Sequence, residues 1–414
     1  MIAIYIIVRF SFKDFLNKIF ARITLCQDGG CEVARSIKGG FQPLPIAGIA
    51  ETADFWFNLC SLSIFQENLL MKFKVIFLLC VAIFAISCSQ NQSGPKKTKI
   101  GFAMDTLKEE RWVRDHDAFE AACKKLNVEC IITVADNKAD KQANDVDNLL
   151  TQGVDVLVIA PHDATQAASM VEKAKAQGVP VISYDRLINS DKIDLYISHQ
   201  VPVIGQKIAE YALQHVPKGN YVMVYGSSTD NNAIIMKNSE LAVLQPAIDK
   251  KDINIVAEDF MDDWKPELSL NFAENALTKN GDNIEAFVVS NDGMAGGVVS
   301  ALEKKGLAGK ILVTGQDAQI DALQRIAEGK QTMTIYKPII PLATGAVEAA
   351  IKLAKKEPLT TTPFKNGDKT VPSILLEVQV VDRSNLMDTV IKDGYAKYED
   401  VYKNVPENER PKKQ

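Results

Sequence analysis

The chain has 414 residues, of which 47% are hydrophobic and 24% charged, and its net charge is −5. This balance is typical of a soluble globular protein with a full core, and the length favours two lobes over one domain. The sequence has no basic excess and no basic stripe, which argues against a nucleic-acid partner.

Residues 1–70 differ from the rest of the chain because they show no clean helical or strand period. They contain Cys26, Cys31, Cys60 and Trp56. Cys26 and Cys31 could form half of a metal site, but no second half at ligand spacing follows them. We infer that translation starts at Met71 and that residues 1–70 are a non-native upstream extension.

The next segment, residues 71–87, begins with lysines at 72 and 74 and continues with an apolar run at 75–86 that is too short to span a bilayer. Small residues then precede Cys88. This segment resembles a bacterial lipoprotein signal peptide, which implies that Cys88 is lipidated and that the mature protein is anchored in the cell envelope, on the periplasmic side. A buried apolar segment, the alternative, leaves the lysines and the small residues unexplained. Residues 88–97 are typical of a flexible tether.

Strands and helices alternate regularly from Lys99 onward. The expected strands of the first half are 100–104, 128–134, 156–159, 179–184 and 195–198, and the expected helices are 109–126, 141–152 and 164–177. The helices carry apolar residues three or four positions apart. This alternation predicts a parallel sheet covered by helices on both faces. Cys123 and Cys130 form either a disulfide or two buried thiols.

The alternation restarts after Ser198. The expected helices there are 203–216, 232–248, 265–279, 295–305, 320–328 and 339–355, and the expected strands are 221–225, 253–259, 286–290, 311–314, 331–336 and 373–381. Two similar α/β halves predict two doubly wound lobes that face each other across a cleft. We expect a polar loop at 360–369 and a frayed polar tail at 396–414.

Polar side chains follow many of these strands. Asp185 and Arg186 come directly after strand 179–184, and similar groups follow the others. Ligands of parallel sheets bind outside the carboxyl ends of the strands, so these groups are expected to converge on the cleft. The groups found at these strand ends are Arg111, Trp112, Asp185, Arg186, Asp230, Asn231, Asn232, Trp264, Asn291, Asp292, Gln316, Asp317 and Lys337.

This set of residue types suits a small sugar. Carboxylates, amides, guanidinium and ammonium groups bond to vicinal hydroxyls, and tryptophan rings pack on the apolar faces of a pyranose. Other interpretations remain: Asp185–Arg186 as a solvated ion pair, Asn291, Asp292 and Asp317 as helix caps, and the tryptophans as core residues. The glycines at 293–297 lack a phosphate-loop ending, so helix packing is the better interpretation.

Residues 99–393 resemble the periplasmic sugar-binding proteins of ABC importers that have the ribose-binding-like, type I fold. The resemblance is carried by EERW at 109–112, GVDVLVI at 153–159, YDRLIN at 184–189, GNYVMVYGSSTDNNA at 219–233, NDGMAGG at 291–297, GQDA at 315–318, GKQTMTIYKP at 329–338 and DTVIKDG at 388–394. It implies that D-xylose, or a closely related aldopentose or aldohexose, is bound by ten candidate residues, with the two tryptophans stacking on the sugar. The ten are Arg111, Trp112, Asp185, Arg186, Asp230, Asn232, Trp264, Asn291, Asp317 and Lys337. It also implies a monomer that closes around the sugar and delivers it to an ABC permease and its ATPase.

The resemblance further implies three hinge crossovers, near 198–201, 336–337 and in the 360s. The first lobe would then comprise 98–198 and 337–358, and the second 199–336 and 359–395. The chain departs from the family after Ser198, where His199-Gln200-Val201-Pro202 replaces an Asp-Asn pair that caps the next helix.

Three other classes of protein compete with this interpretation. A sugar-responsive transcription regulator would need a helix-turn-helix before residue 98, where the signal segment lies. A chemotaxis or signalling sensor uses the same core. A sugar-modifying enzyme would need a base poised by a partner, but the four histidines are isolated in the sequence and no nucleophile elbow occurs. We therefore predict no catalysis, no metal and no cofactor.

Overall fold

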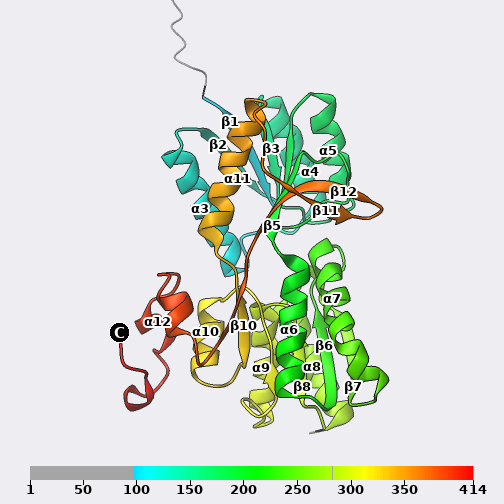
Figure 1. The fold of residues 1–414 in the computed structure, drawn as a ribbon, viewed down its shortest axis with the longest axis vertical. Helices are drawn as coiled ribbons and strands as arrows, with labels where there is room; N and C mark the ends of the chain where they lie inside the picture. Colours follow the sequence, from blue (N-terminus) through cyan, green and yellow to red (C-terminus); the bar gives the residue numbers. More distant parts are fainter. Residues whose placement is uncertain (1–96, 282, 414) are drawn as a thin grey trace, which may run out of the picture. The chain divides into compact units, whose positions relative to one another are not determined.

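The computed structural model describes residues 97–281 and 283–413. The predicted upstream extension, the signal segment, Cys88 and the tether up to residue 96 lie outside the described residues. The described part forms two lobes, each built on a parallel sheet (Figure 1). Within that part, no helix has both the length and the apolar character that a membrane span requires.

The first lobe contains a seven-stranded sheet with the order β11-β12-β5-β4-β3-β1-β2. All its strands pair in parallel except β11, which is antiparallel to β12. The inner strands are buried over almost their whole length, as expected of a parallel sheet covered on both faces. The strands are β1 (Lys99–Met104), β2 (Glu129–Val134), β3 (Val156–Ile159), β4 (Val181–Tyr184), β5 (Leu195–His199), β11 (Thr362–Asn366) and β12 (Lys369–Leu376).

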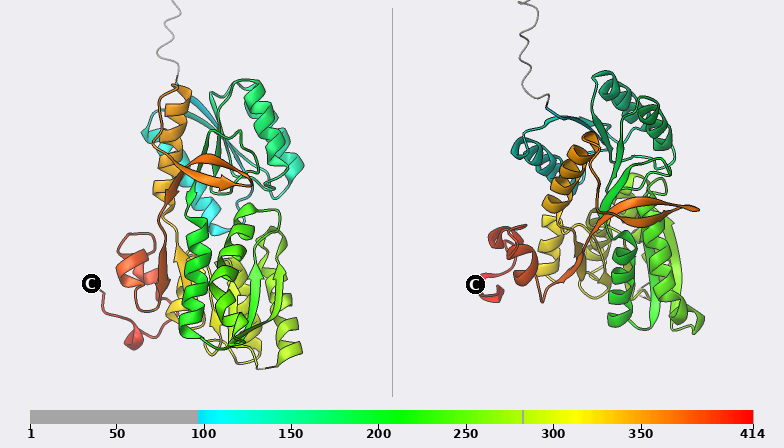
Figure 2. Two further views of the ribbon diagram at one scale, coloured as in Figure 1. Left: turned by 45° about the vertical axis from the view of Figure 1, so that its right-hand side comes forward. Right: turned by 45° about the horizontal axis from the view of Figure 1, so that its top comes forward.

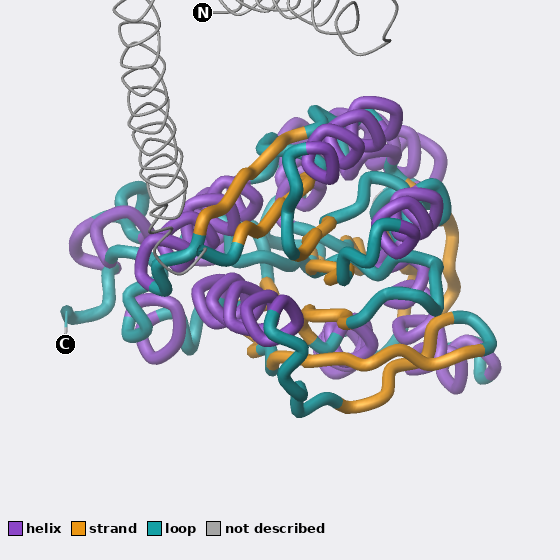
Figure 3. The backbone as a smooth tube through the Cα atoms, turned by 90° about the horizontal axis from the view of Figure 1, so that it is seen from above, coloured by secondary structure: helices purple, strands orange, loops and turns teal. Residues whose placement is uncertain are grey.

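Helices cover both faces of this sheet (Figure 3). They are α3 (Glu110–Lys125), α4 (Ala139–Thr151), α5 (Ala167–Ala176) and α11 (Ile339–Ala354). On one face, Phe119 of α3 and Leu342 of α11 pack with Phe102 of β1. Helices α4 and α5 cover the other face. A disulfide between Cys123 and Cys130 joins the end of α3 to β2, which decides between the two states left open by the sequence.

The second lobe contains a four-stranded parallel sheet with the order β7-β6-β8-β9. Helices α6 and α7 pack on one face and α8 and α9 on the other. Beside this sheet, β10 and β13 form an antiparallel pair. The elements are α6 (Val201–His215), β6 (Gly219–Tyr225), α7 (Asn231–Asp249), β7 (Ile253–Phe260), α8 (Pro266–Asn280), β8 (Ala286–Val289), α9 (Asp292–Lys304), β9 (Leu312–Val313), α10 (Ile320–Ala327), β10 (Met333–Tyr336) and β13 (Gln379–Asp382).

The chain passes between the lobes three times (Figures 1 and 2). The first crossover joins β5 to α6 and the second joins β10 to α11. The third lies at residues 377–378, between β12 and β13, and not in the 360s. The strand expected at 373–381 is therefore two strands, which pair with β5 in one lobe and with β10 in the other.

The prediction of a polar loop at 360–369 is wrong, because most of this segment belongs to the hairpin of β11 and β12. The hairpin turns at Asn366-Gly367-Asp368, and Gly367 has the positive φ of 62° that such turns favour. Since β12 pairs with β5, residues 362–376 extend the first sheet, whereas the expected boundary placed them in the second lobe.

The C-terminal segment that was expected to be a frayed tail is ordered in the structure up to residue 413. Residues Tyr398–Val401 form α12, which lies beside α10 (Figures 1 and 2). Val401, Tyr402 and Val405 are buried in a cluster with Ile326. The apolar side chains recur with helical spacing, which stabilises the segment despite its charges and prolines.

Candidate functional site

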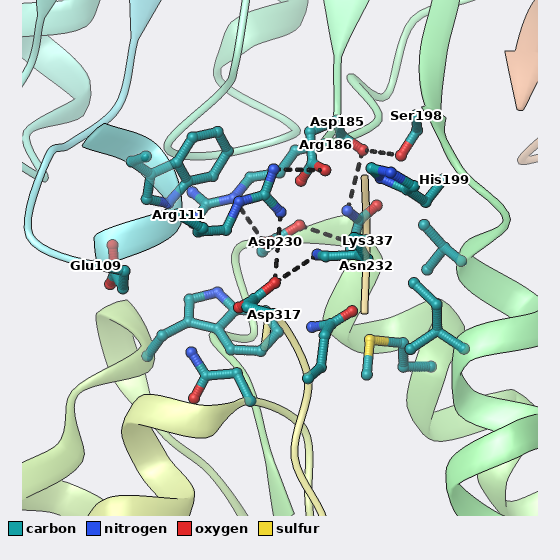
Figure 4. A pocket seen from close by; sticks show the side chains of 17 residues that line it. Glu109, Arg111, Asp185, Arg186, Ser198, His199, Asp230, Asn232, Asp317 and Lys337 are labelled. Carbon is teal, nitrogen blue, oxygen red and sulfur yellow. Dashed lines mark hydrogen bonds and ion pairs between the residues drawn. The ribbon is translucent and has the colours of Figure 1, made fainter. Parts of the chain in front are cut away.

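A pocket lies between the two lobes, and all ten candidate residues line it (Figure 4). They come from the ends of strands and the starts of helices in both lobes. The free volume inside the pocket is only about 30 Å³, which is room for roughly one water molecule. The side chains of the two lobes therefore meet each other almost directly in this structure.

Arg111 and Asp185 form the first charged group of the pocket. Arg111 lies in the first turn of α3, and its Nη2 donates to Oδ2 of Asp185 at 2.9 Å and to Oδ2 of Asp115 at 3.0 Å. Asp185 follows β4 in a left-handed conformation with φ of 59°. Burial alone would raise the pKa of Asp185, but the charges of Arg111 and Lys337 and the hydrogen bond from Arg111 together hold the pKa well below its usual value.

Arg186 forms the second charged group and connects the lobes. Its Nη1 donates to Oδ2 of Asp105, at the end of β1, at 2.7 Å. Its Nε lies 2.8 Å from Oδ2 of Asp230, which belongs to the second lobe. Asp230 also caps α7 by accepting from the backbone N–H of Asn232. One guanidinium thus contacts two buried carboxylates from different lobes.

The two tryptophans differ in their surroundings. Trp112 is buried, and the Cζ atoms of Arg111 and Arg186 lie 4.3 Å and 5.0 Å from the centre of its ring. Trp264 ends the short helix η2 (Asp262–Trp264), and its Nε1 has no hydrogen-bond partner in the described part of the chain. A side chain at Gly226 would collide with the ring, since a Cβ there would lie 2.2 Å from Cη2 of Trp264.

The remaining candidates come from the second lobe and the second crossover. Asp317 lies 2.7 Å from Nζ of Lys337 and 3.8 Å from Nη1 of Arg111. The Nδ2 of Asn232 donates to the backbone oxygen of Asp185 at 3.0 Å, across the lobes. These contacts are drawn in Figure 4.

Of the three residues interpreted as possible helix caps, Asn291 does cap a helix, and it also lines the pocket. Oδ1 of Asn291 accepts from the backbone N–H of Met294 and so caps α9. Asp292 lies outside the pocket lining and accepts from Thr334 and from the backbone of Gln319. Asp317 precedes α10 without capping it.

Several buried polar atoms of the pocket have no hydrogen-bond partner among the described residues. They are Oε2 of Glu109, Nδ1 of His199 and Nε1 of Trp264. Oδ1 of Asp317 also lacks a hydrogen bond, but it lies 2.7 Å from Nζ of Lys337. Leaving a buried polar group unpaired costs about 1–3 kcal/mol. Burial also raises the pKa of Glu109. The pocket therefore suits a ligand that both donates and accepts hydrogen bonds, as a polyhydroxylated molecule does.

Seven lining residues were not among the candidates: Glu109, Ser198, His199, Val201, Ile204, Met236 and Gln316. Ser198 and His199 end β5, and Gln316 shares a strand end with Asp317. The expectation that polar groups at strand ends converge on the cleft therefore also applied to these three residues. The three apolar residues carry no sequence signal for a pocket. No group of histidine, cysteine and acidic side chains in residues 97–281 and 283–413 could hold a metal ion.

Comparison with known proteins agrees with this architecture. Residues 100–358 match the model of the periplasmic binding protein domain. The D-xylose-binding periplasmic protein of Escherichia coli (strain K12) is 41% identical over 329 residues, covering 79% of this chain and 99% of that protein. The protein of the same name from Haemophilus influenzae is 38% identical over 333 residues, covering 80% and 100%.

A solved structure adds support for the fold. The carbohydrate transporter solute-binding protein from Chloroflexus aurantiacus, in complex with D-glucose, has a TM-score of 0.68 and 29% identity and covers 73% of this chain and 97% of that one. The predicted fold class, two α/β lobes of the periplasmic binding protein type, is confirmed. The chain belongs to the family of periplasmic binding proteins.

Proposed function

We propose that this protein captures D-xylose, or a closely related aldopentose or aldohexose, between its lobes and delivers it to an ABC permease. The observation that carries the proposal is the interlobe pocket, whose lining combines paired charges with unpaired buried polar atoms. The names of the two relatives that match nearly full-length point to the same sugar. Binding, and not chemistry on the sugar, is the function proposed.

In this proposal, the ten candidate residues contact the sugar. Arg111, Arg186 and Lys337 donate to its hydroxyls, and the carboxylates beside them accept from the same hydroxyls. Trp264, whose Nε1 has no described partner, supplies one stacking surface. The outer face of Trp112 supplies the other, with its orientation fixed by two guanidinium groups.

Capture follows from the contacts between the lobes. Arg186 with Asp230, Arg111 with Asp317 and Asn232 with the backbone of Asp185 all join one lobe to the other. A monosaccharide is larger than the free volume of the pocket, so it enters when the lobes separate and then shares these polar groups as they close. Closure is favoured by sugar because only the closed form offers both sets of contacts.

The proposal includes attachment to the membrane through lipid on Cys88, with the folded part acting as a monomer. It rests on the sequence at 71–88, which lies outside the described residues. The intact mass of the protein isolated from a membrane fraction tests it: the mass of a chain that starts at a lipidated Cys88 is expected. A mass that includes residues 1–70 would contradict both this and the inferred start at Met71.

The binding proposal is tested by calorimetric titration of the purified protein with a panel of pentoses and hexoses. Saturable binding of one sugar per chain is expected, with D-xylose among the tightest ligands. Chromatography of the recovered sugar should show it unchanged. Failure of every monosaccharide to bind would refute the proposal, and a chemically altered sugar would favour an enzyme.

A further inference from the structure

His199 occupies an unusual position for an ionisable side chain. It is the last residue of β5, at the first crossover, and only 1% of its surface is exposed. It lines the pocket beside Ser198 (Figure 4).

The hydrogen bonding of the ring fixes which nitrogen carries the proton. Nε2 lies 3.3 Å from the backbone oxygen of Pro338, and a carbonyl can only accept, so Nε2 is the donor. Nδ1 then carries a lone pair, and it has no hydrogen-bond partner within the described residues. Burial and the positive charge of Lys337 lower the pKa of His199 to about 3, so the ring is neutral at ordinary pH.

The three aspartates of the pocket already face cations, and the unpaired Oε2 of Glu109 belongs to a carboxyl group whose pKa is raised by burial. Asp185 pairs with Arg111, Asp230 with Arg186, and Asp317 with Lys337. Nδ1 of His199 is a neutral acceptor without such a partner, and a sugar hydroxyl is a donor of the right kind. A buried acceptor left unpaired penalises any ligand that cannot donate to it.

We propose that His199 determines specificity: its Nδ1 accepts a hydrogen bond from one hydroxyl of the bound sugar and so makes that hydroxyl a requirement for tight binding. This rests on the proposed function. It goes beyond that function by naming a residue that selects at a single ring position.

A purely structural role for His199 makes a different prediction. Its contact with Pro338 links the first crossover to the second. If that contact were its only function, replacing His199 would change the affinity for every sugar by a similar factor. If Nδ1 accepts a hydrogen bond from one hydroxyl, replacing His199 lowers the affinity for the parent sugar. The affinity for the analogue that lacks this hydroxyl then changes much less.

The experiment compares wild type, His199→Phe and His199→Gln in titrations with D-xylose and its 2-, 3- and 4-deoxyfluoro analogues, because fluorine replaces a hydroxyl but cannot donate. In wild type, one analogue is expected to bind at least about tenfold more weakly than xylose. That discrimination should largely disappear in His199→Phe and partly return in His199→Gln, whose amide oxygen can accept. His215→Phe, at the far end of α6, is the matched control and should behave as wild type.

Equal analogue-to-parent ratios in wild type and His199→Phe at all three positions would overturn the inference while leaving the proposed function intact. Absence of sugar binding by wild type would overturn both. If His199→Phe does not fold, the ¹⁵N resonance of Nδ1 in wild type decides: it should move toward the hydrogen-bonded value when xylose is added. An unchanged resonance in the sugar complex would refute the inference.

Discussion

Nε of Arg186 and Oδ2 of Asp230 lie 2.8 Å apart, although one residue follows β4 in the first lobe and the other caps α7 in the second. Both side chains are buried, and Arg186 also holds Asp105. A buried carboxylate is stable in its charged form only beside a cation. The guanidinium that is proposed to bind the sugar therefore also joins the two lobes directly.

Arg186→Lys tests the importance of the guanidinium fork. Lysine keeps the positive charge between Asp105 and Asp230 but cannot donate along two fixed directions, so the affinity for sugar should fall at least about tenfold. The midpoint of thermal unfolding should change much less than the affinity. Calorimetry and differential scanning measure the two effects. Arg410→Lys, in the C-terminal segment, is the control, and unchanged affinity in Arg186→Lys would refute the pocket assignment.

Glu110→Ala should weaken binding from outside the pocket. Oε2 of Glu110 in α3 accepts from the backbone N–H of Ile320 in α10, at 2.9 Å, and so joins the lobes. Loss of this partly exposed contact should lower affinity about two- to fivefold through faster dissociation. Stopped-flow tryptophan fluorescence reports the rate.

Glu120→Ala on the same helix is the matched control for Glu110→Ala. It removes the ion pair between Glu120 and Lys124, which lies within α3 and does not reach the second lobe. Equal dissociation rates in the two variants would show that the Glu110 contact does not contribute to closure.

His162 should make stability depend on pH. Its hydrogen bond with Asp105 raises the pKa of His162 above the ordinary value of 6.5, and its Nε2 lies 4.0 Å from Asp263 of the other lobe. Since the folded pKa is raised, the stabilisation is complete below pH 6.5 and is lost as pH rises through the folded pKa. Thermal midpoints from pH 5 to 8 should show a decrease that is shallower in His162→Gln than in wild type. If the thermal midpoint of the variant changes with pH as steeply as that of wild type, other groups cause the pH dependence.

Glu240 should oppose stability at higher pH. It is fully buried in α7, neither carboxylate oxygen has a hydrogen-bond partner in the described part, and burial raises its pKa to about 8. The unfolded chain releases this proton above about pH 4.5, so the free energy of unfolding should decrease between pH 4.5 and 8. Glu240→Gln should therefore unfold at a higher temperature than wild type at pH 8 and gain little at pH 4.5. Glu172→Gln, an exposed glutamate, is the control.

The fold was predictable where strands and helices alternate with clear periods. The predictions failed where the secondary structure of a segment depends on which distant strand it pairs with. The segment of β11 is rich in threonine and lysine and contains Pro363, so it was interpreted as a loop, although Asn366-Gly367 is a strong hairpin signal. The run at 373–381 has one continuous strand pattern, and nothing in that pattern indicates that its two halves pair in different lobes.

The pocket was predictable because strand ends are geometrically special. Parallel strands bring their carboxyl ends to one edge, so the polar groups there were expected to converge, and the ten that the family resemblance selected all line the pocket. Asp105 was missed although it ends β1, because its role depends on Arg186 reaching it across the sheet. The apolar residues Val201 and Met236 could not be distinguished from ordinary core residues.

The late position of β12 has a consequence for biosynthesis. On a ribosome, β5 is made some 170 residues before the strand that pairs with its outer edge. Until that partner emerges, the nascent chain presents the backbone edge of a buried strand, which is the kind of surface that recruits other extended chains. Expression of chains cut before residue 369 should therefore yield aggregates.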